Sequence, residues 1–183
     1  PLYDVHGSVV SGVRRFVGHG KVKLKSLRLS NEAVGLPSGT PVWFGDPPPA
    51  AANHCKSKVL YVAEGEVDTL LLMCLRDAGY IVGGILGFQG GVGPGWWDET
   101  AKLLAEPPTS VVLVVDSDSA GDAYWQRSAQ AFPNAQRVIL PDHTDLTDCM
   151  YKYGVQEVTT LLNSAARSHY QFYQLDSGRF AYM

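Results

Sequence analysis

Cysteine is scarce in this sequence of 183 residues, which contains three: Cys55, Cys74 and Cys149. They are scattered and odd in number, so neither a disulfide framework nor a Cys-based zinc site is supported. His54 precedes Cys55, but no second pair follows at ligand spacing, and we interpret these two residues as part of an ordinary loop.

The sequence also lacks a long apolar run. No stretch reaches the roughly 20 residues that a bilayer helix needs, and no basic segment followed by an apolar one stands near the start. We therefore expect a cytoplasmic protein with no membrane partner. With 45% hydrophobic residues, the chain is long enough to bury a core as one domain, alone or with a small appendage. It begins at Pro1 without a methionine, and we expect a fragment of a longer protein.

Negative charge is missing from one stretch, although the net charge of the chain is −3. Residues 1–55 carry six Lys or Arg and three acids, a balance of +3, whereas residues 56–183 carry nine and fifteen, a balance of −6. All six bases lie in an acid-free span: Arg14, Arg15, Lys21, Lys23, Lys25 and Arg28. A solvated edge strand would also alternate basic and apolar residues, but six bases without an acid exceed what is needed to keep such an edge from pairing with another chain. We interpret the span as a contact for phosphate or nucleic acid.

Periodicity predicts a small β-rich subdomain at the N-terminus. Residues 9–17 and 21–29 are expected to form strands around a glycine-containing turn at 18–20, and a third short strand is expected at 41–44. The prolines within 46–52 cannot donate in a sheet, so we predict that this segment breaks the chain and ends the subdomain.

Further along, predicted strands and helices alternate. The strands are expected at 58–63, 80–86, 110–116 and 136–140, and the helices at 66–78, 96–105, 119–132 and 146–163. Such repeated units predict an α/β fold with a mostly parallel sheet flanked by helices. We divide the chain into a basic β-rich subdomain (1–55), an α/β domain (56–166) and a C-terminal hairpin or start of a further domain (167–183).

Acidic residues follow two of these strands. Glu64 ends the apolar run 59–63, and Asp116 and Asp118 follow the run 110–115. In open α/β sheets, binding sites collect at the carboxyl ends of the strands. Like charges about 4 Å apart repel by roughly 4 kcal/mol at an effective dielectric of 20, so this cluster needs a cation or raised pKa values. Carboxylate oxygens select Mg²⁺ or Mn²⁺, which we predict as the cofactor.

A third acidic group follows the last predicted strand. Asp145 and Asp148 come after residues 136–140 and are preceded by Asp142. A helix N-cap would account for one of these acids. We interpret the group as a second contribution to the same metal site.

Simpler structural roles compete for several residues. Glu66 and Asp68 fall in the first turn of a predicted helix, and we interpret them as capping or surface residues. Asp118 also stands where a helix N-cap is expected. The glycine-rich stretch 87–95 matches no phosphate-binding fingerprint and is interpreted as a flexible connector. Core packing is expected for three tryptophans: Trp96, Trp97 and Trp125.

In order and spacing, the acidic motifs resemble the Toprim domain. The resemblance rests on Ala-Glu-Gly-Glu-Val-Asp at 63–68, Asp-Ser-Asp-Ser-Ala-Gly at 116–121 and Asp-Leu-Thr-Asp at 145–148. Within that superfamily the sequence is most similar to the DnaG-type primases of bacteria, phages and plasmids. Segments 12–15, 25–30 and 42–45 resemble the N-terminal part of the primase polymerase core more loosely.

The resemblance implies the catalytic core of a DNA primase or primase-helicase, an enzyme that makes an oligonucleotide primer on a single-stranded DNA template from nucleoside triphosphates. It implies Glu64 as a metal ligand or general acid/base, and Asp116, Asp118, Asp145 and Asp148 as ligands of the divalent metal. It also implies that four basic residues contact the template or the triphosphate: Arg14, Arg15, Lys25 and Arg28. A replicative helicase, fused or separate, would be a partner.

Two other functions stay open at this point. Toprim domains also occur in metal-dependent nucleases and topoisomerase-like enzymes that cleave strands, although no nucleophilic tyrosine stands out here. A non-catalytic nucleic-acid-binding module of a replication protein is the third possibility. A phosphatase of the haloacid-dehalogenase type fits less well, because it would leave Glu64 without a role.

Overall fold

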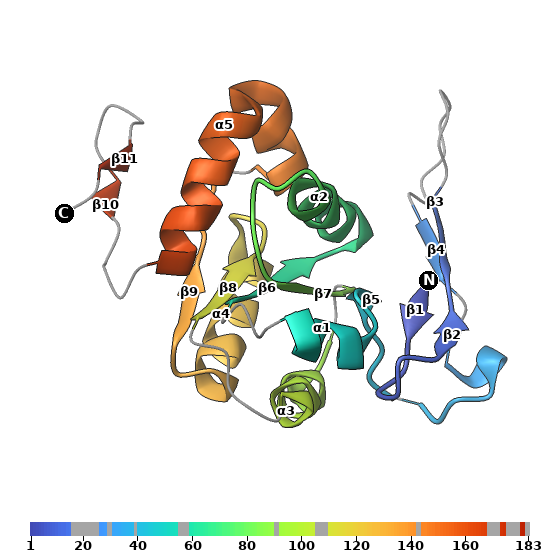
Figure 1. Cartoon of the computed structure of the whole chain (residues 1–183). Coiled ribbons are helices and arrows are strands. Elements are labelled where there is room, and N and C mark those ends of the chain that lie inside the picture. The colour runs from blue at the N-terminus through green and yellow to red at the C-terminus, as the bar shows by residue number, and fades with distance from the viewer. Residues whose placement is uncertain are drawn as a thin grey trace.

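The computed structural model describes residues 1–15, 26–28, 31–38, 40–54, 59–89, 92–104, 110–141, 144–167, 173–174 and 180–181. A five-stranded sheet with the order β5-β7-β6-β8-β9 occupies its centre (Figure 1). The strands are β5 (Phe44–Gly45), β6 (Val59–Glu64), β7 (Gly84–Phe88), β8 (Ser110–Val114) and β9 (Ala135–Arg137). Strands β6 to β9 pair in parallel, and β5 pairs with β7 in the antiparallel direction.

Helices cover both faces of this sheet (Figure 1). They are α1 (Pro48–His54), α2 (Glu66–Asp77), α3 (Pro94–Leu103), α4 (Ser119–Ala131) and α5 (Leu146–Arg167). One core joins the sheet to α1, α3 and α4, and the other joins it to α2 and α5. This arrangement confirms the predicted α/β fold with a mostly parallel sheet flanked by helices.

The two central strands show why the sequence forms this sheet. Residues 111–114 of β8 are fully buried, and those of β6 from 60 to 63 are almost as inaccessible. Successive side chains point to opposite faces of a strand. Leu60 and Val62 therefore enter one core, whereas Tyr61 and Ala63 enter the other. Apolar residues are needed on both faces, which is why these strands are continuous apolar runs.

One predicted strand begins later than expected. The sequence pattern places it at 80–86, but β7 begins at Gly84. Gly79 has a φ of +81°, which ends α2 with a left-handed residue, and Tyr80 and Val82 are exposed in the connection. The sequence pattern predicts strand for these apolar residues because periodicity does not distinguish an exposed apolar connection from the end of a strand.

The N-terminal part is β-rich, as predicted. Strand β1 (Leu2–Tyr3) pairs with β2 (Val9–Ser11), and β3 (Val13–Arg15) pairs with β4 (Ser26–Arg28), both in the antiparallel direction. A short 3₁₀ helix, η1, follows at Glu32–Val34. The predicted turn at 18–20 and Lys25 lie outside the described residues.

The predicted chain break at 46–52 is wrong. Pro48 and Pro49 begin helix α1, which packs in the core beneath the sheet through Ala51. Proline is favoured in the first turn of a helix, where its missing N–H would have had no partner. Both β5 and α1 belong to the predicted subdomain 1–55 and yet pack with the central sheet. The division of the chain into domains stays a prediction.

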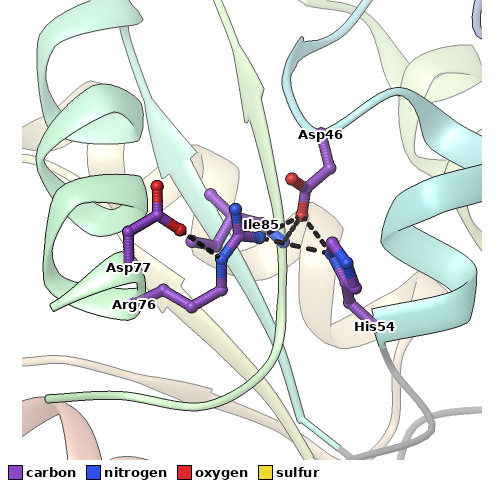
Figure 2. A network of polar contacts seen from close by, with 5 residues as sticks. All are labelled: Asp46, His54, Arg76, Asp77 and Ile85. Atoms are coloured by element: carbon purple, nitrogen blue, oxygen red, sulfur yellow. Dashed lines mark hydrogen bonds and ion pairs between the residues drawn. The ribbon is translucent and has the colours of Figure 1, made fainter. Parts of the chain in front are cut away.

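A buried carboxylate fixes β5 against β7. Asp46 follows β5, and its Oδ2 accepts hydrogen bonds from the Ile85 backbone N–H at 3.0 Å and from Arg76 Nη1 at 2.6 Å (Figure 2). His54 Nδ1 at the end of α1 lies 3.1 Å from the same oxygen, and Arg76 also reaches Asp77. Asp46 is 4% exposed, and this buried carboxylate therefore joins β5, β7, α1 and α2.

The C-terminal elements follow the prediction with one addition. Gly154 has non-helical angles (φ 82°, ψ 171°) inside α5 and divides this helix into two parts. Strands β10 (Tyr173–Gln174) and β11 (Phe180–Ala181) then pair in the antiparallel direction. The interpretation of 167–183 as a hairpin or as the start of a further domain stays a prediction. Among the described residues, we find no helix with the length and apolar character to cross a bilayer.

Candidate functional site

Three chain segments bring acidic residues to one edge of the sheet, here called the carboxyl edge. Strand β6 ends there in Glu64, β8 leads through Val115 to Asp116, and α5 begins there after Asp145. Because β6 and β8 are parallel and in register from Val59 and Ser110 onward, their ends lie side by side. The structure thus places the predicted acidic residues at the common edge that the sequence indicated.

Glu64 is the least solvated carboxylate of the predicted set. Its Oε2 is buried and finds no hydrogen-bond donor in the part of the chain that the structure describes. Burial, together with the charges of Asp116, Asp118 and Asp68, raises the pKa of Glu64 from 4.5 to about 7. A buried acceptor without a donor costs free energy, and such groups mark positions that a cation or a proton would stabilise.

The loop after β8 has a fixed shape. Asp118 is the N-cap of α4, and its Oδ1 accepts from the Gly121 backbone N–H at 2.8 Å. Gly121 packs so tightly that a Cβ there would lie 2.0 Å from the Asp116 carbonyl oxygen. The Ser117 hydroxyl donates to the Leu140 carbonyl at 2.9 Å. Asp118 therefore fulfils the capping alternative and still lies at the site.

The loop after β8 and the start of α5 line a pocket of about 200 Å³ that is open to solvent. It is lined by Asp116, Ser117, Asp118, Thr144, Asp145 and Asp148. The structure therefore brings together four of the five predicted metal ligands in one pocket. The fifth, Glu64, does not line the pocket, but it is close enough for its pKa to respond to Asp116 and Asp118.

Asp145 combines a local structural role with its place in the pocket. Its Oδ1 accepts from the Asp148 backbone N–H at 2.6 Å, as an N-cap of α5 does. One acid of this group thus caps the helix, and both line the pocket. The third acid of the motif, Asp142, lies outside the described residues.

Asp68 has a larger role than the sequence suggested. Instead of lying at the surface, it is 7% exposed, and it accepts hydrogen bonds from Thr147 Oγ1 at 2.7 Å and from the Leu146 backbone N–H at 3.3 Å. It therefore fastens the start of α5 to α2. Burial raises the pKa of Asp68 to about 6, against the lowering effect of Thr147. No pattern near residue 68 encodes a partner 79 residues away.

Mutual repulsion is the main electrostatic property of the pocket. Burial raises the pKa of Asp116 above its ordinary value, and the charges of Asp145, Asp118 and Asp148 raise it further. All these groups are acids, and clustered carboxylates are stable together when they share a proton or a cation. Carboxylate oxygen is also the donor that Mg²⁺ and Mn²⁺ prefer.

The donor chemistry therefore fits a hard divalent cation. Two observations carry the fit: the orphaned Glu64 Oε2 and the like charges that raise the pKa of Asp116. Within the described ranges, no group of three or more His, Cys, Asp or Glu side chains is arranged so that it could hold a metal ion. Metal ligation by Glu64, Asp116, Asp118, Asp145 and Asp148 stays a prediction.

The predicted basic contacts lie on the N-terminal hairpin. Arg14 and Arg15 are on β3 and Arg28 is on β4, with Arg14 opposite Leu27 and Arg15 opposite Ser26. Lys25 is outside the described residues. Contact of these bases with template or triphosphate stays a prediction.

The fold and the acidic pocket together define an α/β protein with a candidate cation site at the carboxyl ends of parallel strands. Solved structures with the same fold are RNA polymerase domains of DnaG-type primases. No protein-family model matches the sequence, and no curated protein matches it.

Two primase structures illustrate the likeness. The Aquifex aeolicus primase (zinc-binding and RNA polymerase domains) superimposes with a TM-score of 0.65 at 20% identity, over 90% of this chain and 39% of that one. The RNA polymerase domain of Mycobacterium tuberculosis primase DnaG gives a TM-score of 0.64 at 22% identity, over 91% of this chain and 53% of that one. This chain thus spans about half or less of those structures, and at these identities the likeness concerns the fold.

Proposed function

We propose that this chain is the catalytic core of a DNA primase, or of a primase-helicase, with a Toprim-type α/β domain. The observation that carries the proposal is the pocket at the carboxyl edge, which is lined by Asp116, Asp118, Asp145 and Asp148. Burial and the charges of this pocket raise the pKa of nearby Glu64. The shared fold with primase RNA polymerase domains adds support. The reaction would join nucleoside triphosphates into a primer on a single-stranded DNA template in the cytoplasm.

The pocket residues suit this chemistry in distinct ways. Asp116, Asp118, Asp145 and Asp148 would hold Mg²⁺ or Mn²⁺, with Glu64 as a further ligand or as general acid/base. A divalent ion bound there would neutralise triphosphate charge and polarise the phosphate under attack. The pKa of Glu64 is about 7, close to neutral pH, so this carboxylate could both accept and release a proton at that pH.

The remaining partners follow from the same proposal. Four basic residues of the N-terminal segment would hold the template or the triphosphate, because a polyanion binds cationic side chains: Arg14, Arg15, Lys25 and Arg28. A replicative helicase, fused or separate, would deliver the template. In a bacteriophage T7 structure (TM-score 0.55, 20% identity), primase domains of two gp4 subunits bound to an RNA/DNA hybrid and dTTP interact with the lagging-strand DNA polymerase.

The test is nucleotide incorporation by the Asp116→Asn, Asp118→Asn double variant. We expect wild type to incorporate labelled nucleotides on single-stranded DNA when Mg²⁺ is present, and the double variant to fold but to show background incorporation. Asp98→Asn removes one charge from an exposed position on α3 and serves as the control. Undiminished incorporation by the double variant would refute the metal assignment. Nicking of supercoiled DNA without incorporation would instead support a strand-cleaving Toprim enzyme.

A further inference from the structure

Arg137 lies next to the acidic pocket but has no place in the sequence-based site. It is the last residue of β9, paired in register with Leu113 of β8. Strand β8 ends one residue after Leu113, at Val114, and Val115 then leads to Asp116. Arg137 therefore lies on the strand next to β8, the strand that Asp116 and Asp118 follow. Its side chain is 19% exposed.

The guanidinium bridges both ends of the loop that carries the two aspartates. Nη2 donates to the backbone carbonyl of Asp116 at 3.0 Å, and Nη1 forms an ion pair with Asp122 in the first turn of α4. Arginine presents its N–H groups in a planar fork, so one side chain can hold two acceptors in a fixed relation. Lysine has no such fork.

The Asp116 carbonyl is held from a second direction by close packing. A Cβ at Gly121 would lie 2.0 Å from this oxygen and 3.3 Å from Arg137 Nη2. The Gly121 N–H in turn donates to the Asp118 side chain. Arg137, the Asp116 carbonyl, Gly121 and the Asp118 carboxylate thus form one connected unit, here called the Arg137 clamp.

We propose that Arg137 is a positioning residue that sets the side chains of Asp116 and Asp118 for binding a divalent cation. This inference rests on the proposed function. Arg137 does not line the pocket, so it acts through the backbone of Asp116 and not by touching the ion. Groups that orient metal ligands in this way typically contribute roughly 10- to 100-fold to metal affinity.

The test measures Mn²⁺ affinity of the full chain by electron paramagnetic resonance, which counts free Mn²⁺ without requiring activity. We expect Arg137→Gln to weaken Mn²⁺ binding by at least about 10-fold. Arg137→Lys, which keeps the charge without the fork, should also weaken binding. Asp122→Asn is the matched control: it removes the ion pair, leaves the bond to the Asp116 carbonyl and should bind Mn²⁺ as wild type does.

A second readout needs no metal. In the metal-free protein, Arg137→Gln should speed hydrogen exchange of the Gly121 amide, while amides in the centre of β8 stay as slow as in wild type. A residue that only stabilised the fold would speed both groups of amides and leave the Mn²⁺ affinity of the folded protein unchanged.

The outcomes separate this inference from the proposed function. Wild-type Mn²⁺ affinity in Arg137→Gln or in Arg137→Lys would overturn the inference and leave the proposed function intact. Equal losses in Arg137→Gln and Asp122→Asn would also overturn it, because the ion pair would then be the cause. A wild type that binds no Mn²⁺ would refute both.

Discussion

The partly buried carboxylate of Glu64 predicts that the metal-free protein is less stable at neutral pH than a variant that is neutral at this position. A carboxyl whose pKa rises from 4.5 in the unfolded chain to about 7 in the folded protein disfavours folding once it is ionised. A shift of this size would correspond to about 3 kcal/mol if it counted in full, but Glu64 is only partly buried, so solvent screening reduces the expected effect to roughly 1 to 2 kcal/mol. The sign is fixed: the penalty is absent below pH 4.5, grows between pH 4.5 and 7, and is complete above pH 7.

Glu64→Gln removes this penalty while keeping the shape of the side chain. In EDTA at pH 8, we expect its free energy of unfolding, measured by urea denaturation, to exceed that of wild type by roughly 1 to 2 kcal/mol. The difference should shrink as the pH falls toward 4.5. Added Mg²⁺ should stabilise wild type more than the variant, since the lost carboxylate is a predicted ligand.

The control and the refuting result are both direct. Glu66→Gln makes the same chemical change two residues along and reports on the loss of one negative charge in this segment. A gain as large in Glu66→Gln would assign the effect to net charge. A Glu64→Gln variant no more stable than wild type at pH 8, or a difference that does not depend on pH, would refute the view that Glu64 is ionised at a cost in folding.

Two further predictions concern residues that do not line the pocket. Replacing Arg14 and Arg15 by Glu should weaken single-stranded DNA binding and reduce its dependence on salt, with a slope lower by about 1.4 for two lost phosphate contacts; unchanged binding would leave the basic segment as a solvated face. Asp46→Asn should lower the free energy of unfolding by about 2 kcal/mol, because Arg76 and the Ile85 N–H lose a charged acceptor. Its Mn²⁺ affinity should match that of wild type, and a loss would show that the Asp46 contacts influence the carboxyl edge.

The fold was largely predictable because burial imposes a simple pattern on parallel strands. Strands β6 and β8 are covered on both faces, so each is a continuous apolar run, and acidic residues follow the run. In the helices, apolar residues recur with the helical period, which distinguishes them from the strands. The prediction was wrong at α1, where prolines were read as a break. A proline excludes a helix interior but favours a helix start, and the local sequence does not say which applies.

The pocket could be predicted as a group but not in its internal arrangement. Residues at the ends of neighbouring parallel strands must share an edge, so Glu64, Asp116 and Asp118 could be brought together from the pattern. Which acid is buried could not. Asp68 and Glu66 are both acids in the first turn of α2. The packing of α5 decides that Asp68 is the one that accepts the hydrogen bond from Thr147.

The sequence by itself determined the order of strands and helices, the asymmetry of charge and the collection of acids at one edge of the sheet. Each of these depends on residues close together in the chain or on a period of two or 3.6 residues. The tertiary structure alone decided that Arg137 holds the carbonyl of Asp116, that Asp68 fastens α5, and that Glu64 is left without a donor. The hydrogen bonds of Arg137 and Asp68 join residues far apart in the chain, and they exist only because strand order and helix packing bring each side chain within hydrogen-bond distance of a backbone group.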